Sequence, residues 1–235
     1  MSAVEPQEWH ARDGQACLQQ LNSRSCGLSA AEAARRLREH GANRLPAARG
    51  AGWLRRLLLQ FHNVLIYVLL ASALLAALLG EWPDCAVILG VVAINALFGF
   101  IQEGKAEQAM RAIRQLLTLD SRVRRDGLVC SVPAEQLVPG DIVLLEAGDR
   151  VPADLRLLEC RELRIDEAML TGESLPAGKQ CAPVAADASL GDRSGMAYSG
   201  TLVSAGNGCG VVVATGTATE LGHISRLLGS VQSLQ

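Results

Sequence analysis

The sequence has few aromatic residues, no closely spaced cysteine pair and no basic cluster, and each absence narrows the possible functions. Aromatic residues make up 3% of the chain although hydrophobic residues make up 49%, a skewed balance for a purely soluble protein. The formal net charge is −2, and no tract is rich in Lys and Arg. The chain therefore lacks the electrostatic footprint of a nucleic-acid-binding protein, and we expect no nucleic-acid partner.

The cysteines are odd in number, widely scattered and never arranged as C-x-x-C. They are Cys17, Cys26, Cys85, Cys130, Cys160, Cys181 and Cys209. Scattered free thiols are typical of a reducing compartment, and thiolate metal sites usually bring two sulfurs close in sequence. We therefore predict no metal-binding domain and interpret most of these cysteines as small buried hydrophobic residues.

A short capped helix is predicted near the N-terminus. Ser29-Ala30-Ala31-Glu32 has the S-x-x-E form of a capping box. The helix that it begins is expected to end near His40-Gly41, because glycine commonly follows the last helical turn. We assign residues 1–50 to an N-terminal cytoplasmic helical segment.

Two apolar runs without formal charge follow, from Leu57 to Gly80 and from Cys85 to Ile101. Each run approaches the ~20 residues needed to cross a bilayer. Both are apolar on all faces, whereas a helix at the surface of a soluble protein has an apolar stripe. We predict a transmembrane hairpin with spans at about 60–80 and 84–102, and the core of a soluble helical bundle is the alternative.

Basic residues around the hairpin set its expected topology. Arg55 and Arg56 precede the first span, Lys105 follows the second, and the connecting turn has no basic residue. By the positive-inside rule both termini are cytoplasmic, in a multi-pass membrane protein. Apolar residues continue to recur at helical spacing beyond Ile101, which predicts a cytoplasmic stalk. We assign residues 51–118 to the hairpin and the stalk.

After the stalk the pattern changes to short β runs separated by Gly, Asp and Pro. Asp126-Gly127 and Gly206-Asn207-Gly208 are expected to be hairpin turns. A capping box, Thr217-x-x-Glu220, should begin a final helix that runs to about Leu228. We predict that residues 119–235 form a small, mainly antiparallel β domain with a distorted jelly-roll path. The fold class is therefore an α+β membrane protein.

The most informative motif is Thr171-Gly172-Glu173-Ser174, within the run IDEAMLTGESLPAGK. Gly172 permits a sharp turn, and the hydroxyls of Thr171 and Ser174 can bond local N–H groups. A bare tetrapeptide of this kind is usually an ordinary surface turn. Two sequence segments on either side of the motif change that interpretation. They are LVPGDIVLLEAGDRVPADLRLLE upstream and MAYSGTLVSAGNGCGVVVATGTATELGHI downstream.

Together these strings resemble the actuator domain of P-type cation-transporting ATPases, in order and spacing. The run GLSAAEAARRLREHGANRLP is similar to the N-terminal segment of the same family, and FIQEGKAEQAM is closest to its calcium-pump-like branch. The resemblance implies that ATP phosphorylates an aspartate elsewhere in the pump and that Glu173 positions the water that hydrolyses the aspartyl phosphate. The implied catalytic residues are Glu173, Thr171, Gly172 and Ser174, with Asp166 and Glu167 as supporting loop residues.

Several roles stay open at this stage. Asp166 and Glu167 fit the acidic pair that precedes the family's loop, and solvated or loop-bonding acids are an equal alternative. Asn95 is interpreted as a helix-packing residue and His62 as an interface residue, because the family's main cation ligands lie on later helices.

The chain lacks the family's phosphorylation motif D-K-T-G-T and any Walker-type phosphate loop. The resemblance implies ATP, Mg²⁺ and a cation such as Ca²⁺ for the complete pump, and we expect none of them to be bound by this chain. The expected partners are the lipid bilayer and the remaining phosphorylation, nucleotide-binding and transmembrane parts. We expect the N-terminal quarter of a pump, without ATPase activity alone. The alternative is a stand-alone, membrane-anchored module that binds or regulates a pump without needing Glu173.

Overall fold

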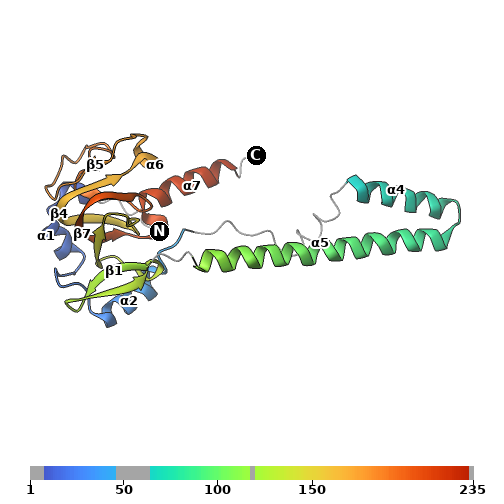
Figure 1. Ribbon diagram of the computed structural model, residues 1–235, viewed down its shortest axis with the longest axis horizontal. Coiled ribbons are helices and arrows are strands. Elements are labelled where there is room, and N and C mark those ends of the chain that lie inside the picture. Colours follow the sequence, from blue (N-terminus) through green and yellow to red (C-terminus); the bar gives the residue numbers. More distant parts are fainter. Residues whose placement is uncertain (1–7, 46–63, 117–119, 233–235) are drawn as a thin grey trace. The chain divides into compact units, whose positions relative to one another are not determined.

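The computed structural model describes residues 8–45, 64–116 and 120–232, which belong to two units (Figure 1). One unit combines the N-terminal segment with the β domain, and the other contains two apolar helices.

The N-terminal segment consists of short helices with side-chain caps. They are η1 (Trp9–Ala11), α1 (Gly14–Gln20) and α2 (Ala30–His40). The carboxylate of Asp13 accepts a hydrogen bond from the backbone of Gln15, and the hydroxyl of Ser29 accepts one from Glu32 at 3.2 Å. Gly41 follows α2 with a φ of 78°. The predicted start and end of this helix are confirmed.

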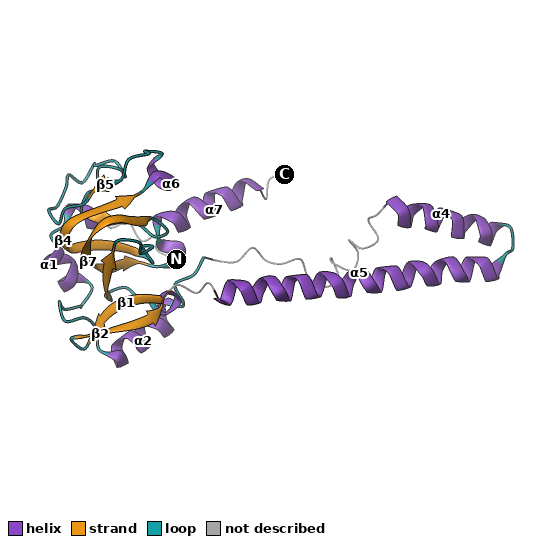
Figure 2. Ribbon diagram, in the orientation of Figure 1, coloured by secondary structure: helices purple, strands orange, loops and turns teal. Residues whose placement is uncertain are grey.

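Seven strands form one open antiparallel sheet (Figure 2). They are β1 (Asp120–Arg125), β2 (Leu128–Pro133), β3 (Ile142–Glu146), β4 (Asp154–Asp166), β5 (Ala177–Gly178), β6 (Met196–Ala197) and β7 (Leu202–Ala214). The strand order is β2-β1-β3-β7-β4-β5, and β6 pairs with β4. Short connecting helices are η2 (Ala134–Gln136), α6 (Ala168–Thr171) and η3 (Gly216–Ala218), and α7 (Glu220–Gln232) ends the described chain. The unit is thus a mixed helix and sheet fold.

The first predicted hairpin turn is confirmed. Arg125 of β1 pairs with Leu128 of β2, and Asp126 and Gly127 between them have φ angles of 51° and 76°. Two consecutive residues with positive φ make a turn whose twist matches that of antiparallel strands, which is why Asp-Gly is favoured there.

The second predicted hairpin turn, at Gly206-Asn207-Gly208, is wrong, because these residues lie inside the continuous strand β7. Gly206 has a φ of 74°, and a Cβ atom there would lie 2.3 Å from the carbonyl oxygen of Glu162. The register between β4 and β7 shifts next to this point. The glycine therefore accommodates a bulge and a close backbone approach, and the chain does not reverse.

The final helix begins later than predicted, because Thr217 lies in the turn η3 and Thr219 is the capping residue. The hydroxyl of Thr219 accepts a hydrogen bond from the backbone of Gly222 at 3.0 Å. Asp154, at the start of β4, accepts another from the backbone of Glu220 at 2.8 Å. The helix start is thus set partly by a side chain that is distant in sequence, which the local pattern does not reveal.

Two larger clusters of buried side chains, and a smaller one of Leu28, Ala33 and Val138, hold the unit together within the described residues. Each fully buried aliphatic side chain contributes about 1.5–3 kcal/mol. The first joins residues of β1, β3, β4 and β7. The second joins Cys17 and Leu18 of α1 to residues of β3, β6 and β7, so the N-terminal segment shares the core of the β domain.

The interpretation of most cysteines as buried is wrong. Cys17 and Cys209 are buried, Cys26 and Cys130 are exposed, and the other three are intermediate. The buried pair lies in the second core cluster, whereas the exposed cysteines lie in a turn after α1 and on the edge strand β2. Burial therefore follows the position in the fold and not the residue type.

The other unit contains α4 (Val64–Leu78) and α5 (Trp82–Leu116), which pack against each other. Within the described chain, Trp82–Gly99 is the stretch long and apolar enough to cross a membrane, with 18 residues and a mean hydropathy of 1.6. Ile66–Leu78 is apolar but shorter. Helix α5 continues without a break past Ile101, as predicted, whereas the start of the first predicted span lies outside the described residues.

Candidate functional site

The motif Thr171-Gly172-Glu173-Ser174, called the TGES loop below, lies in the connection between β4 and β5, where β5 is the last strand in the order of the sheet (Figure 1). Strand β4 ends at Asp166, and the single helical turn α6 follows. Gly172 ends this turn with φ 78° and ψ 0°, in the left-handed region that glycine occupies at little cost. Its N–H donates to the carbonyl of Ala168 at 2.9 Å. The chain therefore turns sharply just before Glu173.

Thr171 connects the loop to Glu167, the residue that follows β4. Its hydroxyl donates to the carbonyl oxygen of Glu167 at 3.1 Å, and its backbone N–H donates to the same oxygen at 3.0 Å. The same hydroxyl accepts a hydrogen bond from the backbone N–H of Glu173 at 3.3 Å. Through these bonds the backbone of Glu173 is connected to the backbone of Glu167.

The tip of the loop faces solvent. Glu173 and Ser174 are exposed, and Leu175 after them is 82% exposed. The segment around Gly191 approaches from the other side, since a Cβ atom on that glycine would lie 3.9 Å from Oε1 of Glu173 and 3.5 Å from Cγ2 of Thr171. An accessible carboxylate on a turn of defined backbone geometry can orient a water molecule and accept a proton from it.

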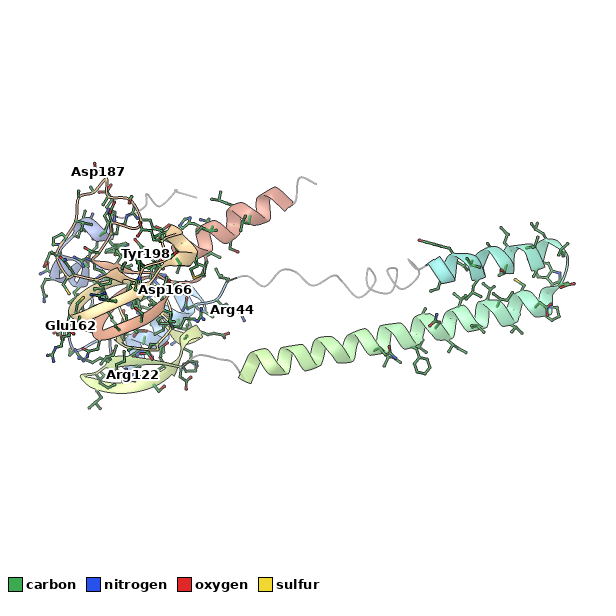
Figure 3. The ribbon with its side chains drawn as sticks, turned by 45° about the horizontal axis from the view of Figure 1, so that its top comes forward. Arg44, Arg122, Glu162, Asp166, Asp187 and Tyr198 are labelled. Carbon is green, nitrogen blue, oxygen red and sulfur yellow. The ribbon has the colours of Figure 1, made fainter. Side chains whose placement is uncertain are left out.

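The two acidic residues before the loop have different surroundings. The carboxylate of Asp166, labelled in Figure 3, accepts a hydrogen bond from the backbone N–H of Ala168, the first residue of α6, at 3.0 Å. Glu167 points into the protein instead, and its side chain is 2% exposed. Asp166 thus fits the loop-bonding alternative, and Glu167 is neither solvated nor bonded to the loop by its carboxylate.

Glu167 forms an ion pair with Lys179, a residue that the sequence did not single out. Nζ of Lys179 lies 2.6 Å from Oε1 of Glu167, and the lysine side chain is fully buried. The ammonium also lies 6.0 Å from the ring centre of Tyr198, within the range of a cation–π contact. The sequence signal was weak, because a lysine just after a two-residue strand is usually solvated.

Burial governs the electrostatics of this ion pair. It raises the pKa of Glu167, an effect that Lys179 partly offsets and the charge of Glu173 reinforces. It lowers the pKa of Lys179, and Glu167 partly offsets that change. Apart from the ion pair, the carboxylate and the ammonium have no hydrogen-bond partner within the part of the chain that the structure describes.

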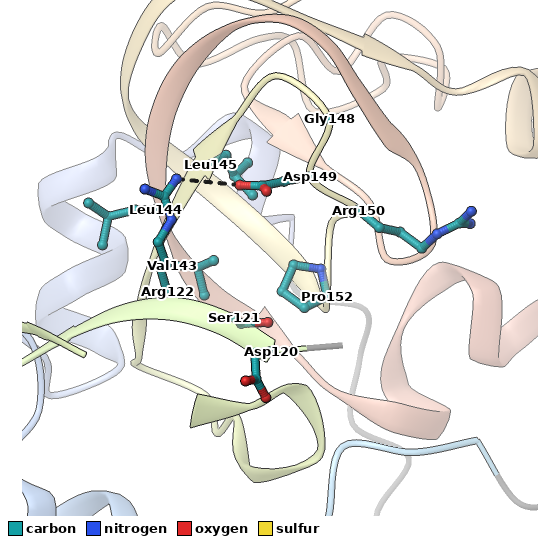
Figure 4. A pocket seen from close by; sticks show the side chains of 10 residues that line it. All are labelled: Asp120, Ser121, Arg122, Val143, Leu144, Leu145, Gly148, Asp149, Arg150 and Pro152. Atoms are coloured by element: carbon teal, nitrogen blue, oxygen red, sulfur yellow. Dashed lines mark ion pairs between the residues drawn. The ribbon is translucent and has the colours of Figure 1, made fainter. Parts of the chain in front are cut away.

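A separate hollow lies between β1, β3 and the turn at residues 148–152, and none of the TGES residues lines it (Figure 4). Arg122 pairs there with Glu146 at 2.7 Å and with Asp149 at 3.6 Å. The carboxylate of Asp149 also accepts a hydrogen bond from the backbone of Glu146 at 2.9 Å. Because Arg122 and Asp149 are engaged in these contacts within the turn, we interpret this hollow as a structural feature.

Metal ligands do not gather in the described ranges 8–45, 64–116 and 120–232. No group of three or more His, Cys, Asp or Glu side chains there could hold a metal ion. The groups that the TGES loop itself offers are one exposed carboxylate, two hydroxyl groups and the backbone of a turn.

Comparison with known proteins gives matches over most of the chain. The family model described as "P-type ATPase actuator domain" matches residues 115–229, and that of the "Cation transporter/ATPase, N-terminus" matches residues 9–76. The probable cation-transporting ATPase F of Mycobacterium tuberculosis is 51% identical over 206 residues, which cover 88% of this chain and 23% of that protein.

Two further relatives are similar in extent. The cation-transporting ATPase pma1 of Synechocystis is 44% identical over 227 residues, or 96% of this chain and 25% of that protein. A calcium-transporting ATPase of Bacillus subtilis is 41% identical over 209 residues, or 88% of this chain and 24% of that protein. The chain thus spans about a quarter of the length of the curated relatives that it matches.

Proposed function

Because the chain belongs to the P-type cation-transporting ATPase family and corresponds to its N-terminal region, we propose that it supplies the actuator domain of an ATP-driven cation pump. In that role the TGES loop promotes the hydrolysis of an aspartyl phosphate formed elsewhere in the pump. The observation that carries the proposal is the exposed carboxylate of Glu173 on a turn fixed by Gly172 and Thr171.

The proposed chemistry uses the residues of the loop. Glu173 orients a water molecule and accepts its proton as the water attacks the phosphorus in line with the leaving aspartyl oxygen. The hydroxyls of Thr171 and Ser174 contact the phosphoryl oxygens. We assign ATP and Mg²⁺ to the remaining phosphorylation and nucleotide-binding parts of the pump, as membership of the family implies for the complete protein.

We also propose that α4 and α5 form a transmembrane hairpin and that the far end of α5 is a cytoplasmic stalk, with both termini in the cytoplasm. The exposed apolar surface of α5 supports this, since 11% of its apolar window is buried. The division into 1–50, 51–118 and 119–235 and the jelly-roll path of the β domain remain predictions. With Cys85 replaced by alanine, cysteines introduced at Ala3 or Ser230 should react with an impermeant thiol reagent only after permeabilisation, and labelling of either introduced cysteine in intact cells would contradict the topology.

The transported cation is proposed by similarity alone. Relatives from Bacillus are named calcium-transporting ATPases, so Ca²⁺ is the first cation to test. The alternative of a stand-alone regulatory module has no support from these relatives, which are all named as ion-transporting ATPases.

The experiment that tests the proposal is Glu173→Ala in a full-length pump that carries this chain. Phosphorylation by ATP should continue, whereas dephosphorylation should slow by about 10²–10⁴-fold, the usual effect of losing a general base. A chase of labelled phosphoenzyme with unlabelled ATP measures this decay. Glu135→Ala removes another exposed carboxylate and is the matched control. Equal decay rates, or loss of phosphoenzyme in a well-folded Glu173→Ala variant, would contradict the assigned role.

A further inference from the structure

The ion pair of Glu167 and Lys179 closes the base of the segment that carries the TGES loop. Glu167 follows β4, and Lys179 follows β5, which pairs with β4. The backbone N–H of Lys179 donates to the carbonyl of Leu163 in β4 at 2.9 Å. Residues 168–176 therefore leave the sheet after β4 and return to it at β5. The side chains of Glu167 and Lys179 flank this segment, with Nζ and Oε1 2.6 Å apart.

Burying this ion pair costs desolvation free energy that a pair of apolar side chains would not cost. An ammonium group has three N–H donors, and here it faces one carboxylate oxygen and the ring of Tyr198. Removing two charges from water costs several kcal/mol per ion, and apolar residues of similar volume are often equally or more stabilising. Stability alone therefore does not account for the two charges, and a buried ion pair of this kind can instead select one conformation.

A continuous set of contacts leads from the ion pair to the exposed carboxylate. The side chain of Lys179 holds Glu167, and the carbonyl oxygen of Glu167 accepts two hydrogen bonds from Thr171. The hydroxyl of Thr171 then accepts the backbone N–H of Glu173. A rotation of the backbone at Glu167 would change the direction in which Glu173 points.

We propose that Glu167 and Lys179 are positioning residues for Glu173, and that their ion pair holds the TGES loop in the geometry needed to aim its carboxylate. Neither side chain touches the reacting atoms. The chemical consequence rests on the proposed function of Glu173, whereas the control of the loop conformation does not.

A double substitution separates positioning from stability. Lys179→Met leaves the carboxylate of Glu167 buried and unpaired, so it should weaken both the fold and the loop. Glu167→Met combined with Lys179→Met removes both charges and should restore the unfolding transition of the wild type. If the ion pair positions the loop, the backbone amides of Thr171 and Gly172 should still exchange about tenfold faster in the double variant than in the wild type.

Hydrogen exchange of the 235-residue chain in detergent, followed by mass spectrometry, measures this effect directly. Peptides from β3 and β7 report the stability of the core in the same experiment. Arg164→Met is the matched control, because Arg164 is an exposed cation in the same β4–β5 ladder. If the loop amides of the double variant exchange as slowly as in the wild type, the proposal is wrong.

The full-length pump provides the functional readout. Phosphoenzyme decay should be slowed in the double variant despite its restored stability, and Lys179→Arg, which keeps the charge, should recover most of the rate. If Glu173→Ala does not slow decay, the proposed function fails while the exchange result still tests the positioning role. If Glu173→Ala slows decay and the double variant decays as the wild type does, the positioning role fails while the proposed function stands.

Discussion

Replacing Arg156 with methionine should lower the free energy of unfolding of the β domain by about 3–5 kcal/mol. Arg156 lies in β4 and is completely buried. All five N–H groups of its guanidinium are used. They donate to the carbonyl oxygens of Arg12 (3.0 and 2.9 Å), Leu157 (3.0 Å), Gly195 (2.9 Å) and Cys181 (3.0 Å).

The magnitude follows from two opposing effects. A hydrogen bond to a charged group contributes roughly 1.5–3 kcal/mol, so five such bonds would exceed the proposed cost if they were additive. Methionine also removes a buried charge, whose desolvation costs several kcal/mol, and the difference leaves about 3–5 kcal/mol. Arg156→Lys keeps the charge but lacks the planar fork that reaches all these carbonyls, so it should also destabilise the domain.

Native-state thiol labelling is a suitable assay, because Cys17 is fully buried in the core cluster that includes α1. A loss of 3 kcal/mol should make its labelling about 100-fold faster, since each 1.4 kcal/mol is a factor of ten. The exposed Cys26 and Cys130 should keep their rates and serve as internal references. Arg161→Met, on the same strand but exposed, is the matched control.

The reasoning about Arg156 would be refuted if Cys17 reacted at the wild-type rate in Arg156→Met. The same conclusion would follow if Arg161→Met accelerated its labelling equally, because burial and hydrogen bonding would then not distinguish the two arginines. A general loosening of the chain would be recognised by faster labelling of Cys26 and Cys130.

Three further predictions concern the β domain. Gly206→Ala should destabilise the domain by more than about 3 kcal/mol in chemical denaturation, because the added Cβ would lie 2.3 Å from a carbonyl oxygen. Gly127→Ala, which has open space around it, should cost about 1–2 kcal/mol. Equal losses of stability in the two variants would contradict the role of the close approach at Gly206. Burial raises the pKa of Asp154 to about 7, so the folded state retains a proton that the unfolded chain releases near pH 4. Asp154 should therefore contribute a fall in stability of up to about 4 kcal/mol as the pH rises from 4 to 7, and Asp154→Asn should remove this contribution; an unchanged pH dependence in the variant would contradict it. Diamide, an oxidant that accepts two electrons and two protons, should convert Cys160 and Cys181 to a disulfide, because their Sγ atoms lie 3.0 Å apart. A peptide map that shows both as free thiols after treatment would refute this prediction.

Local signals predicted the parts of the fold that local geometry decides. The start of α2 depends on Ser29, and the β1–β2 turn depends on Asp126 and Gly127, all within a few residues of the element that they shape. The errors lie where a distant part of the chain decides. Thr219 replaces Thr217 as a cap with the help of Asp154 from β4, and the glycines of β7 serve a close approach to another strand.

The same distinction applies to the candidate site. The exposed turn at residues 171–174 could be predicted, because its glycine and hydroxyl residues act on their immediate neighbours. Lys179 and Arg156 could not, since a lysine or arginine in a sequence is normally solvated and their partners assemble only in the fold. The sequence contains the acidic pair Asp166 and Glu167, but it cannot show that the first carboxylate bonds the backbone of α6 and the second is buried against Lys179.

Two of the buried cations, Lys179 and Arg156, bind the chain that returns from the TGES loop by different means. Lys179 is neutralised by a carboxylate, whereas Arg156 binds carbonyl oxygens of Cys181 and Gly195 farther along the same return. Gly191, which approaches the carboxylate of Glu173, lies just before the second of these carbonyls. The exposed loop is therefore joined to the first of these cations through Glu167, and the segment that passes close to its carboxylate is bound by the second.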